Sequence, residues 1–297
     1  MMKIGVLAFI REDTPDAATV AKKCEALGFE SMFIPEHPII PVECKTPYPL
    51  GDGKIPESYA HMPDPFVLLG FAAAATKRVK LGTGICLVPE RDPIVLAKEV
   101  ATLDYFSGGR FLFGIGAGWL ADETEIMGVE FKKRWKVTHE YVRAMKAMWT
   151  EEQPSFSGEF VSFPKIKSYP KPVQKPHPPI HLGAGGLGSN QRALKMTVAY
   201  ADGWAPIALS PERLAAELAT LSKMCADAGR DFSKIEISIF MEAGQGEPVH
   251  RVSDEAARKT VRDYQEAGAH RLIFLEHQAG NQFETDLEVI AKKFIHS

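Results

Sequence analysis

Several classes of protein are excluded by what this sequence contains little of. Its 297 residues include only four cysteines and no Cys-x-x-Cys pair, which is typical of free thiols in a reducing compartment. No apolar run approaches the roughly 18 to 20 residues that cross a bilayer. The short apolar run at 4–10 is followed at once by charged residues, which favours a strand over a signal peptide. We therefore expect a cytoplasmic protein that does not bind a membrane.

An excess of positive charge is also missing. The chain carries 35 Lys and Arg against 38 Asp and Glu, a formal net charge of -3, whereas nucleic-acid binding needs a clustered basic face. We expect no nucleic-acid partner. With 45% hydrophobic and 25% charged residues, the composition is that of a folded, soluble domain of the size of an enzyme, and we expect a single domain over residues 1–297.

Short apolar runs alternate with segments of helical period along the chain, and the runs are typical of strands buried on both faces. The expected strands are 3–9, 31–35, 79–88, 110–115, 179–184, 201–207, 235–241 and 270–276. The expected helices are 14–27, 64–76, 92–107, 134–149, 189–199, 210–228, 253–267 and 283–296. Four of these helices open with a capping residue followed by proline, at Thr14, Asp64, Asp92 and Ser210. The alternation predicts an α/β fold, a (β/α)8 TIM barrel.

Two connections are too long for simple loops. They are the proline-rich segment 36–63 and the segment 150–178. Long ordered loops are usually functional, and both of these leave from the side of the barrel where the strands end. We expect them to be insertions at the C-terminal face that form a lid over the barrel mouth.

In a TIM barrel the chemistry lies at the carboxyl ends of the strands, and here those ends are rich in glycine. The expected third, fourth and fifth strands end in the runs 82–85, 114–119 and 183–189. Glycine lets a flat or phosphorylated ligand approach the backbone closely, although each run taken alone is equally well explained as a turn. Three such runs on neighbouring strands favour a cofactor site.

The last of these runs spells Gly-x-Gly-x-x-Gly through Gly183, Gly185 and Gly188. Four strands precede it, and the next acid at a strand end, Asp202, comes too soon for the spacing of a dinucleotide-binding fold. We interpret the run as a phosphate cradle at a helix N-terminus. Side chains placed to assist are Ser189, Asn190 and Arg192.

His37, just after the second expected strand, is the candidate acid or base, because histidine titrates near neutral pH. The alternative is a histidine that only hydrogen-bonds the loop backbone. Other titratable residues at strand ends are Glu36, Glu90, Arg91, Asp92, Glu242, Glu276 and His277, of which Asp92 is best explained as a helix cap. No His-x-His follows the first strand and no Gly-x-Ser-x-Gly occurs, so we expect neither a metal site nor a nucleophilic hydrolase.

An ordered set of motifs carries a family resemblance that spans the chain. The motifs are Leu-Gly-Thr-Gly-Ile at 81–85, Pro-Ile-Val-Leu-Ala-Lys-Glu at 93–99, Leu-Asp at 103–104, Ser-Gly-Gly-Arg at 107–110, Gly-Ile-Gly-Ala-Gly-Trp at 114–119 and Ala-Asp-Gly-Trp at 201–204. Together they resemble the bacterial luciferase-like monooxygenase superfamily. Within it, the sequence is most similar to the branch that depends on the deazaflavin coenzyme F420.

The resemblance implies a barrel whose mouth holds a flavin or deazaflavin, with the ring against strands 2 to 4 and the phosphate over the glycines after strand 5. It implies a non-prolyl cis peptide bond between Gly84 and Ile85, and it gives His37 the acid/base role. The implied cofactor-binding residues are Glu36, Gly84, Ile85, Gly116, Gly118, Trp119, Gly183, Gly185, Gly186, Leu187 and Gly188.

The implied chemistry depends on the cofactor. Coenzyme F420 carries hydride and gives a dehydrogenase or reductase, whereas reduced FMN reacts with oxygen and gives a monooxygenase. We expect F420-dependent hydride transfer to or from a small organic substrate, with an FMN-dependent two-component monooxygenase as the alternative. Less favoured hypotheses are a non-catalytic flavin-binding barrel and, last, a metal-dependent barrel hydrolase.

Trp119 departs from the pattern of related sugar-phosphate and alcohol dehydrogenases, which carry a glutamate at this place. An indole cannot transfer protons, so the sequence predicts neither substrate, and Trp119 suggests a stacking wall for an apolar or planar one. The resemblance also implies a homodimer through the helices after strands 2 and 3. The segments 64–76 and 92–107 are apolar enough for this, although packing on the barrel explains the same residues.

Overall fold

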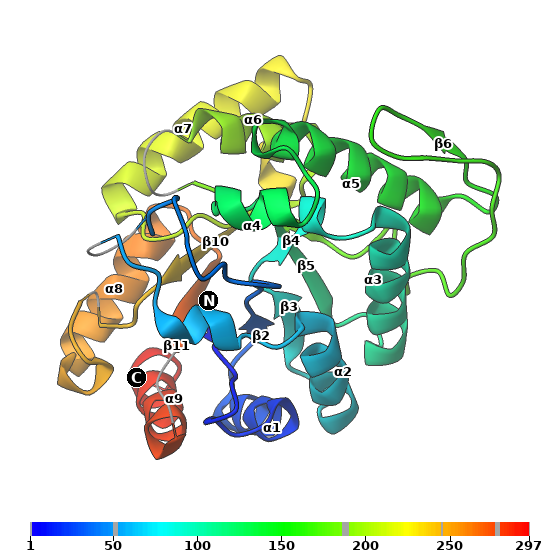
Figure 1. Ribbon diagram of the computed structural model, residues 1–297. Helices are drawn as coiled ribbons and strands as arrows, with labels where there is room; N and C mark the ends of the chain where they lie inside the picture. Colours follow the sequence, from blue (N-terminus) through cyan, green and yellow to red (C-terminus); the bar gives the residue numbers. More distant parts are fainter. Residues whose placement is uncertain (1, 50–52, 186–189, 245, 277–279, 297) are drawn as a thin grey trace.

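The computed structural model describes residues 2–49, 53–185, 190–244, 246–276 and 280–296. Within them, parallel strands form a closed barrel ringed by helices (Figure 1). The barrel is closed by the pairing of β1 with β11 and of β3 with β5, so the predicted TIM barrel is confirmed. The strands are β1 (Lys3–Ala8), β2 (Ser31–Ile34), β3 (Lys80–Thr83), β4 (Cys86–Leu87), β5 (Phe111–Gly116), β8 (Ile180–Leu182), β9 (Gly203–Trp204), β10 (Glu236–Met241) and β11 (Arg271–Glu276).

The strands are apolar on both faces because each face meets a different core. Alternate residues of β1 such as Val6 pack outward against the helices, while Leu7 points into the barrel. The same alternation sends Phe33 and Phe240 inward, where their rings lie edge to face at 5.9 Å. This two-sided burial explains why the strands appear as unbroken apolar runs in the sequence.

The helices form the outer ring. They are α1 (Ala17–Leu27), α2 (Pro65–Ala75), α3 (Pro93–Ser107), α4 (Ala121–Ile126), α5 (Arg134–Thr150), α6 (Gln191–Tyr200), α7 (Pro211–Asp227), α8 (Asp254–Glu266) and α9 (Gly280–Phe294). The predicted caps at Asp64, Asp92 and Ser210 are confirmed. The predicted cap at Thr14 is wrong, because Asp16 accepts from the first-turn amides of α1. No helix in the described ranges is long and apolar enough to cross a membrane.

Short elements account for most differences from the predicted pattern. The expected strand 79–88 is divided into β3 and β4 by a cis peptide bond between Gly84 and Ile85, which confirms the implied cis bond. Helix α4 and the hairpin of β6 (Phe156–Ser157) and β7 (Ser162–Phe163) were not predicted. The 3-10 helices are η1 (Glu57–His61), η2 (Val88–Glu90), η3 (Phe131–Lys133), η4 (Phe232–Lys234) and η5 (Val249–Arg251).

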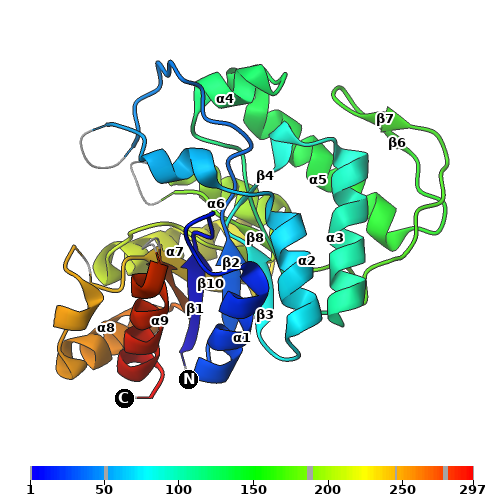
Figure 2. The ribbon, with the colours of Figure 1, turned by 60° about the horizontal axis from the view of Figure 1, so that its bottom comes forward.

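The two long connections behave differently. The segment 36–63 lies beyond the carboxyl ends of the strands, whereas the segment 150–178, with β6 and β7, runs down the outer flank (Figure 2). Glu140 of α5 holds the hairpin there by accepting from three backbone amides, the closest at 2.6 Å from Phe160 N. The prediction that 150–178 forms part of a lid is therefore wrong.

Candidate functional site

A cavity of about 970 Å³ opens at the carboxyl ends of the strands. This size suits a cofactor or drug-sized ligand. Its inner wall is apolar, and the segment 36–63 covers one side through Tyr48 and Tyr59. The apolar wall residues are Leu7, Phe9, Ile85, Leu87, Ala205, Ile207, Phe240 and Leu275.

The polar centre of the cavity is His37, which follows β2 and is 8% exposed. Its Nδ1 lies 2.7 Å from Oε2 of Glu123, a fully buried carboxyl group on α4. Its Nε2 lies 3.3 Å from the indole nitrogen of Trp119. Because an indole N–H only donates, Nε2 is the acceptor, and the neutral ring carries its hydrogen on Nδ1 toward Glu123. His37 is therefore oriented with a basic nitrogen facing the cavity.

Aromatic rings enclose the face of His37. The Tyr59 ring lies 5.2 Å from the imidazole, centroid to centroid, and the Trp119 ring lies at 5.7 Å. The hydroxyl groups of Tyr48 and Tyr59 are 2.8 Å apart. Burial raises the pKa of Tyr59 far above its usual value, so this phenol stays neutral and its hydrogen bond with Tyr48 is kept at any physiological pH. The rings exclude water from one side of the imidazole.

The glycines at the strand ends make room for one side chain, that of Ile85. A Cβ atom added at Gly116 would lie 2.0 Å from Cδ1 of Ile85, and one at Gly183 would lie 2.3 Å from its Cγ2. At Gly114 the obstacle is the backbone, since a Cβ would lie 2.0 Å from the carbonyl oxygen of Thr83. These positions require glycine because the chain around Ile85 occupies the space a side chain would need.

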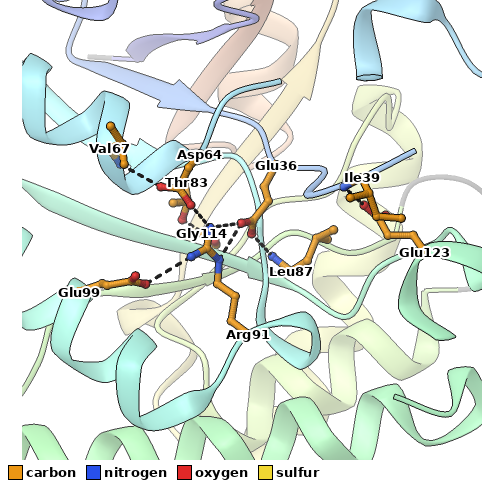
Figure 3. A network of polar contacts seen from close by, with 10 residues as sticks. All are labelled: Glu36, Ile39, Asp64, Val67, Thr83, Leu87, Arg91, Glu99, Gly114 and Glu123. Atoms are coloured by element: carbon orange, nitrogen blue, oxygen red, sulfur yellow. Dashed lines mark hydrogen bonds and ion pairs between the residues drawn. The ribbon is translucent and has the colours of Figure 1, made fainter. Parts of the chain in front are cut away.

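Behind this wall, Glu36 belongs to a network of charges centred on Arg91 (Figure 3). Glu36 Oε2 accepts from the amide of Leu87 at 2.7 Å, and its Oε1 accepts from Arg91 Nε at 2.7 Å. Arg91 also pairs with Asp64 at the start of α2 and with Glu99 of α3. Burial alone would lower the pKa of Arg91, but the charge and hydrogen bond of Glu36, together with Cys86 and Asp64, outweigh it and raise that pKa. The network joins the site to both helices.

Three consecutive residues of helix α4 contact different parts of the site. Asp122 accepts from the amide and hydroxyl of Thr46, at 3.0 and 2.7 Å, and so anchors the segment 36–63. Glu123 pairs with His37. The Thr124 hydroxyl lies 2.8 Å from Oε1 of Glu90. A helix of six residues thus connects the loop above the cavity, the imidazole inside it and the carboxyl behind it.

One part of the cavity lining is basic, and we call it the basic end. Arg134 of α5 and Arg192 and Lys195 of α6 line it, next to Gly183 and Gly185. Burial and the charge of Arg192 lower the pKa of Arg134. An anion bound between the two guanidinium groups would relieve this repulsion, and the first turn of α6, which lines the same end, contains no acidic residue.

The structure brings together most of the residues that the sequence singled out, while their predicted roles stay predictions. The residues among them that line the cavity are Glu36, His37, Gly84, Ile85, Gly118, Trp119, Gly183 and Gly185. Gly116 lies behind Ile85 rather than at the cavity surface. The remaining predicted residues, Gly186, Leu187 and Gly188, together with Ser189 and His277, lie outside the described residues. Asn190 donates to Glu217 through its side-chain amide.

The sequence interpretation missed Glu123, Tyr48, Tyr59 and Arg134. Glu123 stands 86 positions from His37, and no local pattern pairs residues so far apart. The available indication was the acidic doublet 122–123, separated by two residues from the glycine-rich run 114–119 at the end of the fourth predicted strand. The tyrosines were inside a segment that the sequence identified only as a lid.

The chain is similar to known proteins along most of its length. The family model described as luciferase-like monooxygenase matches residues 2–294. An uncharacterized protein of Mycobacterium tuberculosis is 41% identical over 205 residues, 68% of this chain and 71% of the relative. The F420-dependent glucose-6-phosphate dehydrogenase of Kineococcus radiotolerans is 33% identical over 65% of this chain and 53% of its own. The FMNH(2)-dependent dimethylsulfone monooxygenase of Pseudomonas putida is 32% identical over 63% and 49%.

Solved structures share the fold at low identity. The coenzyme F420 dependent tetrahydromethanopterin reductase from Methanopyrus kandleri superposes with a TM-score of 0.75 at 17% identity, covering 99% of both chains. An F420-dependent secondary alcohol dehydrogenase superposes with a TM-score of 0.76 at 18% identity, covering 98% of both. At these identities the likeness shows the fold alone.

Proposed function

The chain belongs to the luciferase-like monooxygenase family, and we propose that within it the protein is a coenzyme F420-dependent oxidoreductase that transfers hydride to or from a small organic substrate. Members of the family are oxidoreductases and monooxygenases that use F420 or FMN. The observation that carries the finer proposal is His37, held by a fully buried carboxyl group with its other ring nitrogen facing the cavity.

Reduction of a carbonyl group requires a proton as well as a hydride, and oxidation of an alcohol requires a base. His37 meets both needs, because an imidazole can give or accept a proton and Glu123 fixes its orientation. A substrate hydroxyl would take the place of the Trp119 N–H at Nε2, where the existing contact of 3.3 Å is long and weak. Trp119, Tyr48 and Tyr59 then orient the substrate and exclude water.

The volume of the cavity, its apolar wall and its basic end support a deazaflavin as the cofactor. When bound, F420 would supply a carbon centre that gives or accepts hydride. Leu7, Ile85 and Phe240 would hold its ring from the barrel side. Its phosphate and acidic tail would lie at the basic end, with Arg134, Arg192 and Lys195.

The second candidate is an FMN-dependent monooxygenase, which the dimethylsulfone monooxygenase relative favours. The same apolar wall would hold the isoalloxazine ring. The basic end distinguishes the two cofactors by charge, because FMN carries one phosphate there whereas F420 carries a phosphate and several carboxylates. Three cations are more than one phosphate requires, which supports F420.

An anaerobic titration of the purified protein with F420 and, separately, FMN tests this proposal. Trp119 lines the cavity, so we expect F420 to quench tryptophan fluorescence in a saturable way. We expect FMN to bind weakly, because it carries fewer negative charges to the basic end. The control is Trp119→Phe, which should lose most of the quenching while the cofactor absorbance still reports binding. Preferential binding of FMN would overturn the F420 proposal in favour of the FMN-dependent monooxygenase.

Binding of neither cofactor would overturn both candidates. Binding without turnover of carbonyl, alcohol and activated alkene substrates would favour a flavin-binding barrel without catalysis. Arg192→Gln tests the basic end separately. We expect it to weaken F420 binding about tenfold, and more at low than at high salt, because the contact is electrostatic and partly exposed.

We also propose a homodimer that uses the outer faces of α2 and α3. These helices lie side by side (Figure 1), and they expose Phe71 and Val95 by more than half and Phe106 by 76%. Apolar side chains gathered in this way mark contact surfaces. Light scattering should give twice the chain mass of 32.7 kDa, and Phe106→Glu should give the monomer. A monomeric wild-type protein would contradict the proposal.

A further inference from the structure

Glu90 is a buried carboxyl group that the proposed reaction does not use. It ends η2 and is 5% exposed. Its Oε2 is fully buried and has no hydrogen-bond partner among the residues that the structure describes. Its Oε1 lies behind the cavity wall, because a Cβ atom added at Gly118 would be 3.0 Å from it. Only one backbone layer therefore separates this carboxyl from the cavity.

The Thr124 hydroxyl shows which form of Glu90 the packing favours. Thr124 Oγ1 lies 2.8 Å from Glu90 Oε1 and 3.0 Å from the carbonyl oxygen of Leu120. A hydroxyl has one hydrogen to donate, and a carbonyl oxygen can only accept. If Glu90 is protonated, it supplies a second hydrogen and both contacts are satisfied. If Glu90 is ionised, one of the two contacts has no hydrogen.

No cation neutralises Glu90 within the described part of the chain. Arg91 is the next residue, but its guanidinium group is committed to Glu36, Asp64 and Glu99. On α5, which packs against η2, Arg134 donates to the carbonyls of 118 and 131. The charged groups that act on Glu90 are Glu123 and Glu36, and the helix packed against η2, α5, carries Arg134 and Tyr141. The groups that act on it most directly are thus carboxylates.

We propose that Glu90 is a carboxylic acid at neutral pH and that its proton controls the Glu123 and His37 pair, which makes Glu90 a positioning residue. Burial and the nearby charge of Glu123 raise the pKa of Glu90 to about 8, against an opposing effect of Thr124. While Glu90 is neutral, Glu123 is the carboxylate that acts on His37. When Glu90 ionises, a second negative charge lies next to Glu123 and changes the electrostatic environment of His37.

Infrared difference spectroscopy of the purified protein tests the protonation directly. Between pH 6 and pH 9, the wild type should lose the carbonyl band of a protonated carboxylic acid, with a midpoint near pH 8. Glu90→Gln keeps a neutral side chain of the same shape and should lack this change. The matched control Glu125→Gln removes an exposed carboxylate from α4, the helix that carries Glu123, and should leave the change intact. A wild-type protein without the band, or a band that remains in Glu90→Gln, would overturn the proposal.

Histidine NMR tests the effect on His37. With His37→Gln used to assign its signal, the wild type should show a second inflection near pH 8, and Glu90→Gln should show a single one. Identical His37 curves in the two proteins would contradict the control of His37 by Glu90. The role in turnover rests on the proposed function, but both spectroscopic experiments are done without cofactor or substrate. They can therefore succeed where the proposed function fails, and the reverse.

Discussion

Buried charged groups are paired more completely at one end of the barrel than at the other. At the amino ends of the strands, Arg271 is fully buried, yet it pairs with Glu30 and Glu236 and contacts Ser238 at 3.1 Å. Lys3 and Lys80 add a second cation to each carboxylate. At the carboxyl ends, Arg91 pairs with three carboxylates, and among the described residues one oxygen of Glu90 has no hydrogen-bond partner.

The shifts in pKa reflect this difference. Burial by itself would raise the pKa of Glu30, but Arg271 outweighs it and lowers that pKa to about 2. Burial and Arg271 lower the pKa of His181 to about 4, so the amino end holds its neutral histidine next to fixed ion pairs. The carboxyl end instead raises the pKa of an acid. One end is arranged for stability, and the other keeps groups that can exchange protons.

The largest expected effect comes from removing the central cation of the stable end. Arg271→Met leaves Glu30 and Glu236 without their main partner, and we expect a loss of about 3 to 5 kcal/mol in the free energy of unfolding. Urea unfolding measures it. Cofactor affinity of the folded variant should not change, because the site lies at the other end. A loss below about 1 kcal/mol would show that the network is not a stability device.

The matching change at the other end should reduce rate and leave stability nearly unchanged. His37→Gln should lower turnover by about 100- to 1,000-fold, the typical value for a general acid or base, while the cofactor dissociation constant changes by less than about threefold. Steady-state kinetics with a substrate found by screening measures the first, and fluorescence titration the second. Unchanged turnover would place the acid or base elsewhere.

The two ends should also respond to pH with opposite sign. His181 binds a proton more weakly in the folded state than at the ordinary pKa of 6.5, so stability falls as pH drops from 6.5 toward 4, by on the order of 3 kcal/mol. Glu90 binds its proton more tightly in the folded state, so its contribution is present below pH 4.5 and is lost as pH rises toward 8.

Unfolding of His181→Gln and Glu90→Gln over pH 4 to 9 separates these effects. His181→Gln should flatten the acid side of the stability profile, and Glu90→Gln should remove the fall in stability as pH rises toward 8. The contribution of Glu30 is fully present above pH 4.5 and is lost only as pH falls toward 2, because its folded-state pKa is about 2. If a variant and the wild type show the same dependence of stability on pH, the substituted residue does not contribute to that dependence.

The smallest expected effect lies at the rim of the stable end. Lys80 pairs with Glu30 at 3.1 Å, but its side chain is 40% exposed. Lys80→Met should therefore cost less than about 1 kcal/mol, and less again at high salt. A larger loss would show that Lys80, and not Arg271 alone, compensates the buried negative charge of Glu30.

The fold could be predicted far more completely than the site. Buried parallel strands and capped amphipathic helices leave local patterns, and the expected helices begin and end within a few residues of α1 to α3 and α5 to α9. Helix α4 escaped because its six residues include three acids and show no apolar period. The glycine runs were recognised, but their tight packing on Ile85 depends on three strands meeting in space.

The residues proposed to hold or transfer protons could be predicted only in part, because their roles depend on contacts between residues far apart in the sequence. His37 could be selected from its place after a strand, but its partner could not. Glu90 was one of several titratable residues at strand ends, and nothing in its neighbours along the chain separates it from Asp92, which only caps a helix. The difference arises from burial beside Glu123 and Thr124, both contributed by a helix that follows another strand.

Helix α4 has a consequence for how this enzyme can diversify. Its consecutive residues Asp122, Glu123 and Thr124 hold the covering segment, the imidazole and the buried acid. New substrates are most simply accommodated by sequence changes in the segment 36–63. Only changes that keep the contact between Thr46 and Asp122 would leave α4, and with it the proposed proton transfer at His37, undisturbed. Selection for a different substrate is therefore constrained at one short helix, and descendants with altered specificity should preserve its length even where the loop above it differs.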